Sequence, residues 1–384
     1  MDFTWSEEQL DLKDKVLQFG LKELQDDVVA RDATGTFASA LWKKCADFGV
    51  FKYAAPSRYG GIDDKINLIK GIIVMESLGL SCKDNGLALG VSTQMWTVQM
   101  PLAHFGTTEQ CEEYFPKLLS GELIGAHAIT EPEAGSDPSE MKTLARKVEN
   151  GYVLSGTKCL ITLAPVADFF LVFASTNQKL GKWGISAFLV NKDVSGLEIG
   201  PSEPKMGLRT VPLGKIVFKD CFVPETARIG KEGAGLSIMN HSLEYDRGFI
   251  LVSQIGTMQR QINETLLHIN QRKQSGKQIK DFQSISNRLA DMRLRIETCR
   301  LLSYKVAWLK TNNKSALLEA AMLKLHLSES FNASSLDAVR CHGGIGYLQN
   351  YAVERNLRDA TGGLIYAGTS DIQRNIISQL MEIE

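Results

Sequence analysis

The spacing of apolar residues changes twice along this 384-residue chain, and those changes constrain the fold more than any other feature. In the first 120 residues or so, apolar side chains recur at helical spacing, and Ser6 followed by Gln9 has the pattern of a helix-capping box. The next segment consists of short β-branched or aromatic runs between turn residues, namely Tyr152–Leu154, Phe169–Ala174, Ile185–Val190 and Ile216–Phe218. This second pattern predicts a strand-rich antiparallel domain.

Long helical periods return in the last third of the chain, over Leu236–Ile269, Phe282–Lys310 and Ser315–Val339. Such periods fit an antiparallel bundle of helices. The sequence therefore predicts an α+β protein with an N-terminal helical domain over residues 1–120, a middle antiparallel β domain over residues 121–229, and a C-terminal helical bundle over residues 230–384.

Composition excludes several classes of protein. The net charge of −1 gives no footprint for nucleic-acid binding. No run approaches the roughly 18 apolar residues that a membrane span needs, and the acidic N-terminus does not resemble a signal peptide. Seven cysteines are scattered singly, which indicates reduced thiols and no disulfide or metal framework. We expect a cytoplasmic protein without a metal site or a membrane or nucleic-acid partner.

Four local motifs carry the chemistry. The first, Ala128–Asp137, packs a glycine and small hydroxyl residues into one loop, where N–H and O–H groups can bind phosphate or carbonyl oxygens. Considered alone, this first motif is a polar turn. The second motif, Lys158–Thr162, is the end of a strand. Arg272–Gly276 is a basic loop whose guanidinium suits a pyrophosphate, and Cys341–Gly346 is a glycine-rich turn.

These motifs, together with Leu364–Arg374 near the C-terminus, resemble in order and spacing the signatures of the acyl-CoA dehydrogenase family of flavoenzymes. The resemblance covers essentially the whole chain and implies FAD as cofactor, a four-helix C-terminal bundle and a homotetramer. It also implies that an arginine reaches FAD across a subunit interface. The residues that it assigns to FAD are Ile129, Thr130, Gly135, Ser136, Leu160, Ile161, Thr162, Arg272, Gln283, Arg340, Gly343, Gly344, Thr369, Ser370 and Asp371.

Three positions depart from the family pattern. Leu160 replaces a tryptophan that shields the flavin, and an aliphatic side chain covers less of a ring than an indole does. Ser275 replaces a phenylalanine, and Asp371 replaces a glutamine or glutamate. The first departure suggests a flavin edge that is more open than usual, although Leu160 can also be read as a smaller core residue.

The catalytic base is the main open question. Many family members carry a glutamate before the Gly-Thr of the last signature, where this chain has Ala367. Other members carry the base on a helix directly before an arginine, and counting from Gly235 places that position on Asp246. Glu244 lies two residues earlier, about 200° around a helix, so the two carboxylates should face nearly opposite directions. Spacing favours Asp246, the longer side chain favours Glu244, and the absence of a base is the third possibility.

Within the family, the chain is most similar to dehydrogenases of polyketide and nonribosomal-peptide pathways, which act on aminoacyl groups such as prolyl held on a carrier protein. The resemblance is carried by Met100-Pro-Leu, Ala164–Asp168, Trp183–Phe188 and Gly368–Asp371. It implies an FAD-dependent dehydrogenase or oxidase that oxidises a small acyl or aminoacyl thioester by base-assisted removal of the α-proton, in an antibiotic or other natural-product pathway. The expected substrate contacts are Ser136, Arg247, Tyr366 and Ala367.

The thioester can be carried by a carrier protein or by CoA, and the electron acceptor can be oxygen or an electron-transfer flavoprotein. Leu160 in place of tryptophan favours oxygen. Tyr245-Asp246, where the carrier-protein relatives have Trp-Glu, argues against assigning proline outright. The alternatives are a flavin-dependent monooxygenase on the same fold, an acyl-CoA dehydrogenase for a short branched acyl-CoA, and a flavoprotein without catalytic activity.

Overall fold

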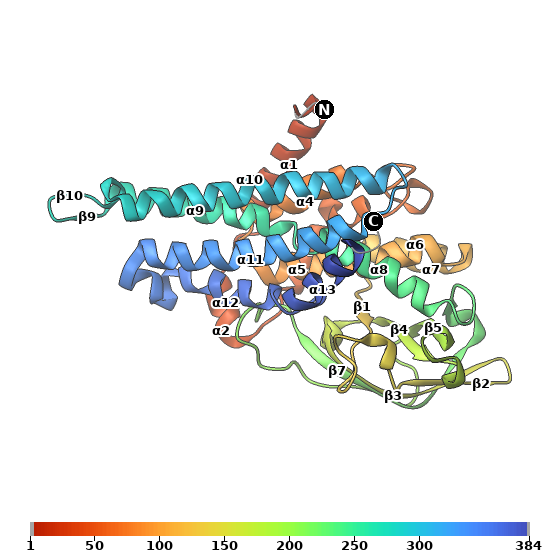
Figure 1. The fold of residues 1–384 in the computed structure, drawn as a ribbon. Helices are drawn as coiled ribbons and strands as arrows, with labels where there is room; N and C mark the ends of the chain where they lie inside the picture. Colours follow the sequence, from red (N-terminus) through yellow and green to blue (C-terminus); the bar gives the residue numbers. More distant parts are fainter. Residues whose placement is uncertain (1–3, 382–384) are drawn as a thin grey trace.

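The computed structural model describes residues 4–381 and shows two helical regions with a β domain against one side (Figure 1). Helix α1 begins with the predicted capping box: Ser6 Oγ accepts from Gln9 N (3.2 Å) and Gln9 Oε1 accepts from Ser6 N (3.0 Å). A π-helical segment, Gln94–Gln99, separates two later helices and is buried. The N-terminal helices are α1 (Glu7–Glu23), α2 (Val28–Thr34), α3 (Ser39–Phe48), α4 (Leu68–Ser81), α5 (Asn85–Thr93), α6 (Met100–Phe105) and α7 (Thr108–Leu119).

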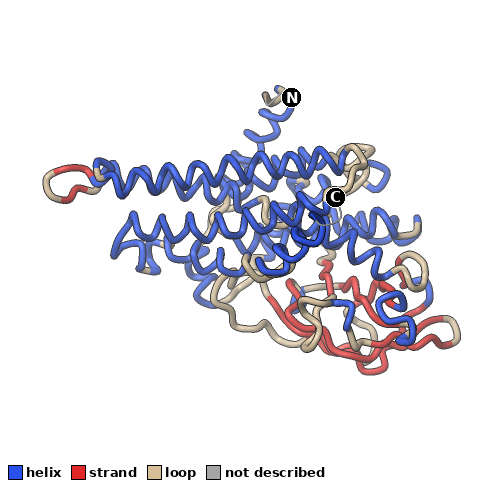
Figure 2. Tube along the Cα trace, in the orientation of Figure 1, coloured by secondary structure: helices blue, strands red, loops and turns tan. Residues whose placement is uncertain are grey.

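The middle domain is an eight-stranded sheet in the order β6-β7-β3-β2-β4-β5-β8, with β1 beside β4. Its core lies on β4 and β5, whose apolar side chains are buried along both strands. Figure 2 shows the strands of this domain, in red, gathered below the helices. The strands are β1 (Gly125–Ala128), β2 (Leu144–Val148), β3 (Gly151–Thr162), β4 (Phe169–Ser175), β5 (Ile185–Asn191), β6 (Leu197–Ile199), β7 (Leu213–Pro224) and β8 (Arg228–Ile229).

The sheet is mixed, so the prediction of an antiparallel sheet was incomplete. β1 pairs with β4 in parallel, and β2 makes one parallel pair with β4 at Leu144 and Ser175. A parallel pair needs a crossover connection, and the segment from β1 through the β2–β3 hairpin supplies it before β4. Local runs of apolar residues predict strands but do not reveal which non-neighbouring strands pair.

Four helices form the C-terminal bundle: α8 (Gly235–Phe249), α9 (Ser253–Gln271), α10 (Gln283–Thr311) and α11 (Leu317–His342). α12 (Val353–Gly363) and α13 (Ser370–Met381) pack on α11. A small hairpin of β9 (Lys273–Gln274) and β10 (Lys277–Gln278) joins α9 to α10 and projects from one end of the bundle (Figure 1). No helix in residues 4–381 is both long and apolar enough to cross a bilayer.

The helical period predicted over Leu236–Ile269 is divided into α8 and α9. Between them, N–H groups bond to carbonyls three residues earlier, as Val252 does to Phe249. The break lies where α9 and α4 are in backbone contact, since a Cβ on Gly79 would lie 1.7 Å from the carbonyl oxygen of Ser253. The division therefore reflects tertiary packing, which the period of apolar residues does not encode.

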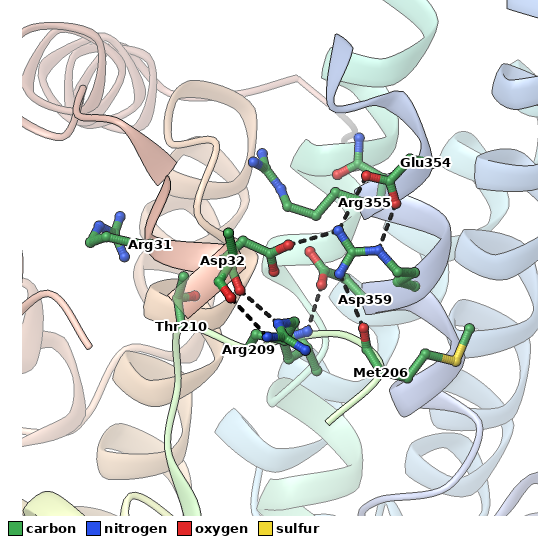
Figure 3. A network of polar contacts seen from close by, with 12 residues as sticks. Arg31, Asp32, Met206, Arg209, Thr210, Glu354, Arg355 and Asp359 are labelled. Atoms are coloured by element: carbon green, nitrogen blue, oxygen red, sulfur yellow. Dashed lines mark hydrogen bonds and ion pairs between the residues drawn. The ribbon is translucent and has the colours of Figure 1, made fainter. Parts of the chain in front are cut away.

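A polar network joins all three parts of the chain (Figure 3). Arg358 of α12 donates to Asp32 at the end of α2 (2.7 Å) and to the carbonyl of Met206 in the loop before β7 (3.0 Å). Asp359, the next residue, accepts from Leu208 N (2.5 Å) and from Asn85 Nδ2 of α5 (2.8 Å). These contacts fix the β domain against both helical regions.

Candidate active site

The loop Ala128–Asp137 is fixed to β3 by a buried ion pair. Lys158 Nζ lies 2.8 Å from Glu131 Oε1 and donates to the carbonyl of Ile129 (2.9 Å); the Lys158 side chain is fully buried. Burial lowers the pKa of Lys158 to about 8, although the Glu131 carboxylate opposes this shift. Glu131 also accepts from the N–H groups of Lys142 and Thr143 (2.5 and 3.0 Å). Two motifs that are separate in sequence thus become one rigid unit.

This unit brings the predicted flavin residues Ile129, Thr130, Ile161 and Thr162 close together, because Cys159 N donates to the carbonyl of Thr130 (2.9 Å). Ile161 is buried and Thr162 is half-buried. Leu160 lies in the β-bulge between Lys158 and Ile161, with φ at 55°, and its side chain is 61% exposed. A left-handed leucine is uncommon, and here it places an exposed apolar side chain beside two threonines.

The distal part of the same loop is open. Ser136 is exposed, and a Cβ built on Gly135 would meet no heavy atom within 4 Å. A loop with a free hydroxyl and uncrowded backbone N–H groups can accept a phosphate. The apolar Leu160, the two threonines and the open Gly135–Ser136 backbone therefore fit a flavin ring with its pyrophosphate.

A second group of predicted FAD residues lies elsewhere in the chain. Arg272 precedes the β9–β10 hairpin and Gln283 begins α10, while the Arg288–Asp337 pair (2.6 Å) shows that the start of α10 adjoins the end of α11. This end of the bundle is remote from the β domain in Figure 1. Within one chain, the structure does not bring together the two groups of FAD residues. The second group, all exposed, comprises Arg272, Gln283, Arg340, Gly343 and Gly344.

The start of α13 supplies the remaining predicted FAD residues. Thr369 Oγ1 caps the helix by accepting from Ile372 N (3.2 Å), and Ser370 Oγ is buried without a hydrogen-bond partner among the described residues. Asp371 is exposed and lies 3.3 Å from Arg374. Ser370 therefore has an unused hydroxyl, whereas Asp371 is directed to the surface.

Tyr366 and Ala367 lie in the turn between α12 and α13. Ala367 has φ at 57° and Gly368 at 84°, and Gln373 Nε2 donates to both carbonyls (3.0 and 3.1 Å). The Tyr366 hydroxyl accepts from Gln254 Nε2 of α9 (3.1 Å). The turn is thus held in place from both sides.

Asp246 is a buried carboxylate on α8, only 6% exposed, and its Oδ1 has no hydrogen-bond partner in residues 4–381. Burial raises its pKa to about 7, while the positive charges of Arg247 and Lys324 act in the opposite direction. The pKa of Tyr366 is raised chiefly by burial and further by the Asp246 charge, so the carboxylate lies near the turn that carries Ala367. Ala367 has no carboxylate, whereas Asp246 supplies one whose charge acts on the neighbouring Tyr366.

Glu244 has a different environment, as its position on the helix predicts. Its carboxylate accepts from Lys310 Nζ of α10 (2.8 Å) and from Ala316 N just before α11 (3.0 Å). Lys310 also lies over the ring of Tyr245, 4.8 Å from its centroid. Glu244 therefore joins three helices and has both oxygens occupied, which is the arrangement of a structural ion pair.

Arg247, the remaining predicted substrate residue, and His127 lie on α8 and β1. Arg247 follows Asp246, is half-buried, and has an Nε without a partner among the described residues. His127 of β1 is 3.0 Å from Ser242 Oγ, and burial together with the Lys158 charge lowers its pKa to about 3, so it is neutral. No group of three or more metal-ligating side chains occurs in the described part of the chain.

Sequence reasoning missed the Glu131–Lys158 pair and Lys324. Both charges lie inside the Ala128–Asp137 and Lys158–Thr162 motifs, but their separation of 27 positions in the sequence conceals the contact. Lys324 is fully buried on α11 beside Asp246, yet a single lysine in a helical pattern is usually solvated. Neither contact leaves a local signal in the sequence.

Comparisons with known proteins agree with this geometry. Residues 6–122, 126–221 and 233–381 match the N-terminal, middle and C-terminal domains of acyl-CoA dehydrogenases. The chain is 36% identical over 384 residues, the full length of both proteins, to an L-prolyl-[peptidyl-carrier protein] dehydrogenase of Pseudomonas fluorescens.

Two solved structures are similarly close. The prolyl acyl carrier protein oxidase AnaB superposes with a TM-score of 0.97 at 41% identity, covering 98% of this chain and 100% of that one. PigA with FAD and proline superposes with a TM-score of 0.96 at 36% identity over the whole of both chains. The chain belongs to the acyl-CoA dehydrogenase family.

Proposed function

We propose that this protein is an FAD-dependent dehydrogenase or oxidase of a small acyl or aminoacyl thioester, with Asp246 as the base that removes the α-proton. The observation that carries the proposal is the state of Asp246, which is buried, has a free oxygen, and has a pKa of about 7. A base with such a pKa is half-ionised near neutral pH and suits proton transfer. FAD, when bound, supplies the acceptor for the hydride that leaves the substrate.

The chain's own residues would hold the reactants. Thr130, Thr162 and Leu160 are presented by the Glu131–Lys158 unit for the flavin ring, and Ser136 for its pyrophosphate. The turn at Tyr366–Ala367 would place the thioester α-carbon against Asp246, and the small Ala367 side chain leaves space there. Asp246 Oδ1 would receive the proton. Its burial excludes water that would otherwise compete for it.

The proposed carrier of the thioester is a peptidyl carrier protein, and the acyl group is prolyl or of similar size. This follows from the relatives, of which one is named for prolyl on a peptidyl carrier protein, and AnaB for prolyl on an acyl carrier protein. PigA was solved with FAD and proline. The proposed role is therefore in a natural-product pathway, with an aspartate where those carrier-protein enzymes are expected to have glutamate.

The proposed assembly is an oligomer of two or more chains, and a homotetramer is the family expectation. Two observations support it. The predicted FAD residues occur in two remote groups, so residues from two chains would be needed to enclose one FAD. Leu294, Leu301 and Trp308 of α10 are 62%, 51% and 54% exposed at seven-residue spacing, which forms one apolar stripe. We also propose a cytoplasmic location, supported by seven unpaired cysteines.

The electron acceptor is proposed to be oxygen, with an electron-transfer flavoprotein as the alternative. Leu160 supports oxygen because its exposed aliphatic side chain covers less of a flavin than an indole would. Anaerobic reduction followed by mixing with air tests this point. Reoxidation within seconds supports oxygen, and reoxidation over many minutes supports the flavoprotein.

The test of the function is anaerobic mixing of the FAD-loaded enzyme with L-prolyl thioesters, followed by loss of the oxidised-flavin absorbance. We expect rapid bleaching by L-prolyl on a phosphopantetheinylated carrier protein, and slow bleaching by L-prolyl-CoA or isovaleryl-CoA. Faster bleaching by isovaleryl-CoA would instead identify a branched-chain acyl-CoA dehydrogenase. Absence of bleaching by every thioester would contradict the proposal.

A further inference from the structure

Lys324 is a buried cation with no hydrogen-bond partner of its own. It lies on α11 with a side chain that is 0% exposed, and its Nζ has no partner anywhere in residues 4–381. The other fully buried lysine, Lys158, contrasts with it, since that ammonium binds Glu131 and a backbone carbonyl. A buried ammonium is expensive unless an anion compensates for it. The position of Lys324 therefore needs an explanation.

Asp246 is the anion whose charge acts most strongly on Lys324. α8 and α11 pack together, and the Asp246 charge raises the pKa of Lys324, while burial lowers it to about 8 overall. Each of the two groups has a buried polar atom without a hydrogen-bond partner in the described chain, namely Asp246 Oδ1 and Lys324 Nζ. Asp246 and Lys324 thus lie on two helices that pack together, and each places an unpaired polar atom in the interior of the protein.

Of the other charged or titratable groups around α8, Arg247 alone also acts on Asp246 through its positive charge. Lys310 is committed to Glu244 on another face of the helix. His104 and His241 have pKa values lowered by burial, so they are neutral, and Tyr366 has its pKa raised by burial. Arg247 follows Asp246 on the same helix, about 100° around its axis, and its charge also lowers the pKa of Asp246. Lys324 adds a second positive charge from α11, the helix that packs on α8.

We propose that Lys324 is a positioning residue for Asp246, whose ammonium keeps the buried carboxylate ionised and ready to accept the substrate's α-proton. The proposal rests on the assignment of Asp246 as the base. Without a facing cation, a carboxylate at this depth would stay protonated at neutral pH and could not act as a base. Lys324 would touch neither substrate nor flavin, and would act through the charge of Asp246.

The test compares Lys324→Met with Lys310→Met, which removes the α10 cation that pairs with Glu244 on another face of α8. The rate constant of anaerobic flavin reduction by L-prolyl carrier protein is measured from pH 5.5 to 10. In Lys324→Met, the rising limb should move about one to two pH units to higher pH, with near-normal rates restored at the top of the range. Lys310→Met should leave the limb in place. An unmoved limb, or an equal loss at every pH in Lys324→Met, would overturn the proposal.

A stability cycle gives a readout that does not depend on activity. The change in melting temperature caused by Lys324→Met is measured at pH 8 in wild type and in Asp246→Asn. We expect the change to be more favourable in the Asp246→Asn background, because no carboxylate is then left uncompensated. If Lys324→Met alone fails to retain FAD, recovery in the double variant gives the same support. Equal changes in both backgrounds, or no recovery, would refute the coupling.

The two assignments fail in different ways. If Asp246→Asn reduces flavin at the wild-type rate, the base assignment is wrong, whatever the stability cycle shows. If Asp246→Asn is inactive but Lys324→Met keeps a wild-type pH limb and shows no coupling, Asp246 is the base and Lys324 is only a core residue. Each result therefore identifies which of the two claims is wrong.

Discussion

Two buried aspartates of this protein, Asp246 and Asp359, occupy contrasting environments. Asp359 accepts hydrogen bonds at both oxygens, from Leu208 N and Asn85 Nδ2, within the network that joins the domains (Figure 3). Asp246 has an oxygen without a partner among the described residues and is stabilised only by charges nearby. Burial raises both pKa values, to about 6 for Asp359 and to about 7 for Asp246.

The contrast separates structure from chemistry. A carboxylate whose lone pairs are occupied stabilises the contact between domains and has no free oxygen for a substrate. A carboxylate left unpaired in the core is costly to the fold, and such groups are concentrated at functional sites. A raised pKa alone therefore does not identify a base, because the two aspartates share it. The oxygen of Asp246 that has no partner among the described residues distinguishes them.

The largest difference between the two aspartates should be in the rate constant of flavin reduction. Asp246→Asn keeps the size of the side chain and removes its basicity, so we expect flavin reduction by the thioester to slow about 10³-fold or more. Asp359→Asn should change this rate constant less than about threefold, because both oxygens of Asp359 are occupied by Leu208 N and Asn85 Nδ2. Anaerobic stopped-flow reduction measures both. Similar losses in the two variants would show that the aspartates share a structural role.

Stability should show the reverse order. Asp359→Asn replaces one of the two accepting oxygens by an amide N–H₂, which then faces a donor, so the free energy of unfolding should fall by about 1–3 kcal/mol. Asp246 has a pKa near 3.8 when unfolded and about 7 when folded, so wild type loses stability as pH rises through this window. Asp246→Asn lacks that loss, and its stability relative to wild type should increase between pH 4 and 7. Denaturant unfolding at several pH values would contradict this if the difference were constant.

Glu244, which is half-buried, offers a further comparison, and it resembles Asp359 because both of its oxygens are occupied. Glu244→Gln loses the charge opposite Lys310 but keeps one acceptor for Ala316 N, so we expect a loss of about 1–2 kcal/mol in unfolding free energy. Flavin reduction should stay within about threefold of wild type. A large loss in the rate of flavin reduction with little change in the unfolding free energy would identify Glu244 as the base.

The smallest expected effect comes from the flavin loop, away from both aspartates. Leu160→Trp adds an indole at an exposed bulge position, so we expect slower reoxidation of reduced flavin by oxygen, by about two- to tenfold. The rate of flavin reduction should be unchanged, because Asp246 is not altered. Reoxidation at the wild-type rate would show that Leu160 does not control access of oxygen.

Much of this arrangement could be predicted from the sequence. The periods of apolar residues predicted the helix–sheet–helix order, and 100° per residue was sufficient to place Glu244 and Asp246 on different faces of α8. The parallel pairing of β1 with β4 and the break between α8 and α9 depend on contacts between distant segments. The same holds for Lys324, whose importance arises only because α11 places it against α8.

The most direct test of the account is the pH dependence of single-turnover flavin reduction in wild type beside Asp246→Asn. An ionised base is required, so the wild-type rate constant should rise with pH to a plateau, with a midpoint near the Asp246 pKa of about 7. In Asp246→Asn the residual rate should not show that limb. A limb that persists with the same midpoint in Asp246→Asn would show that another group removes the proton.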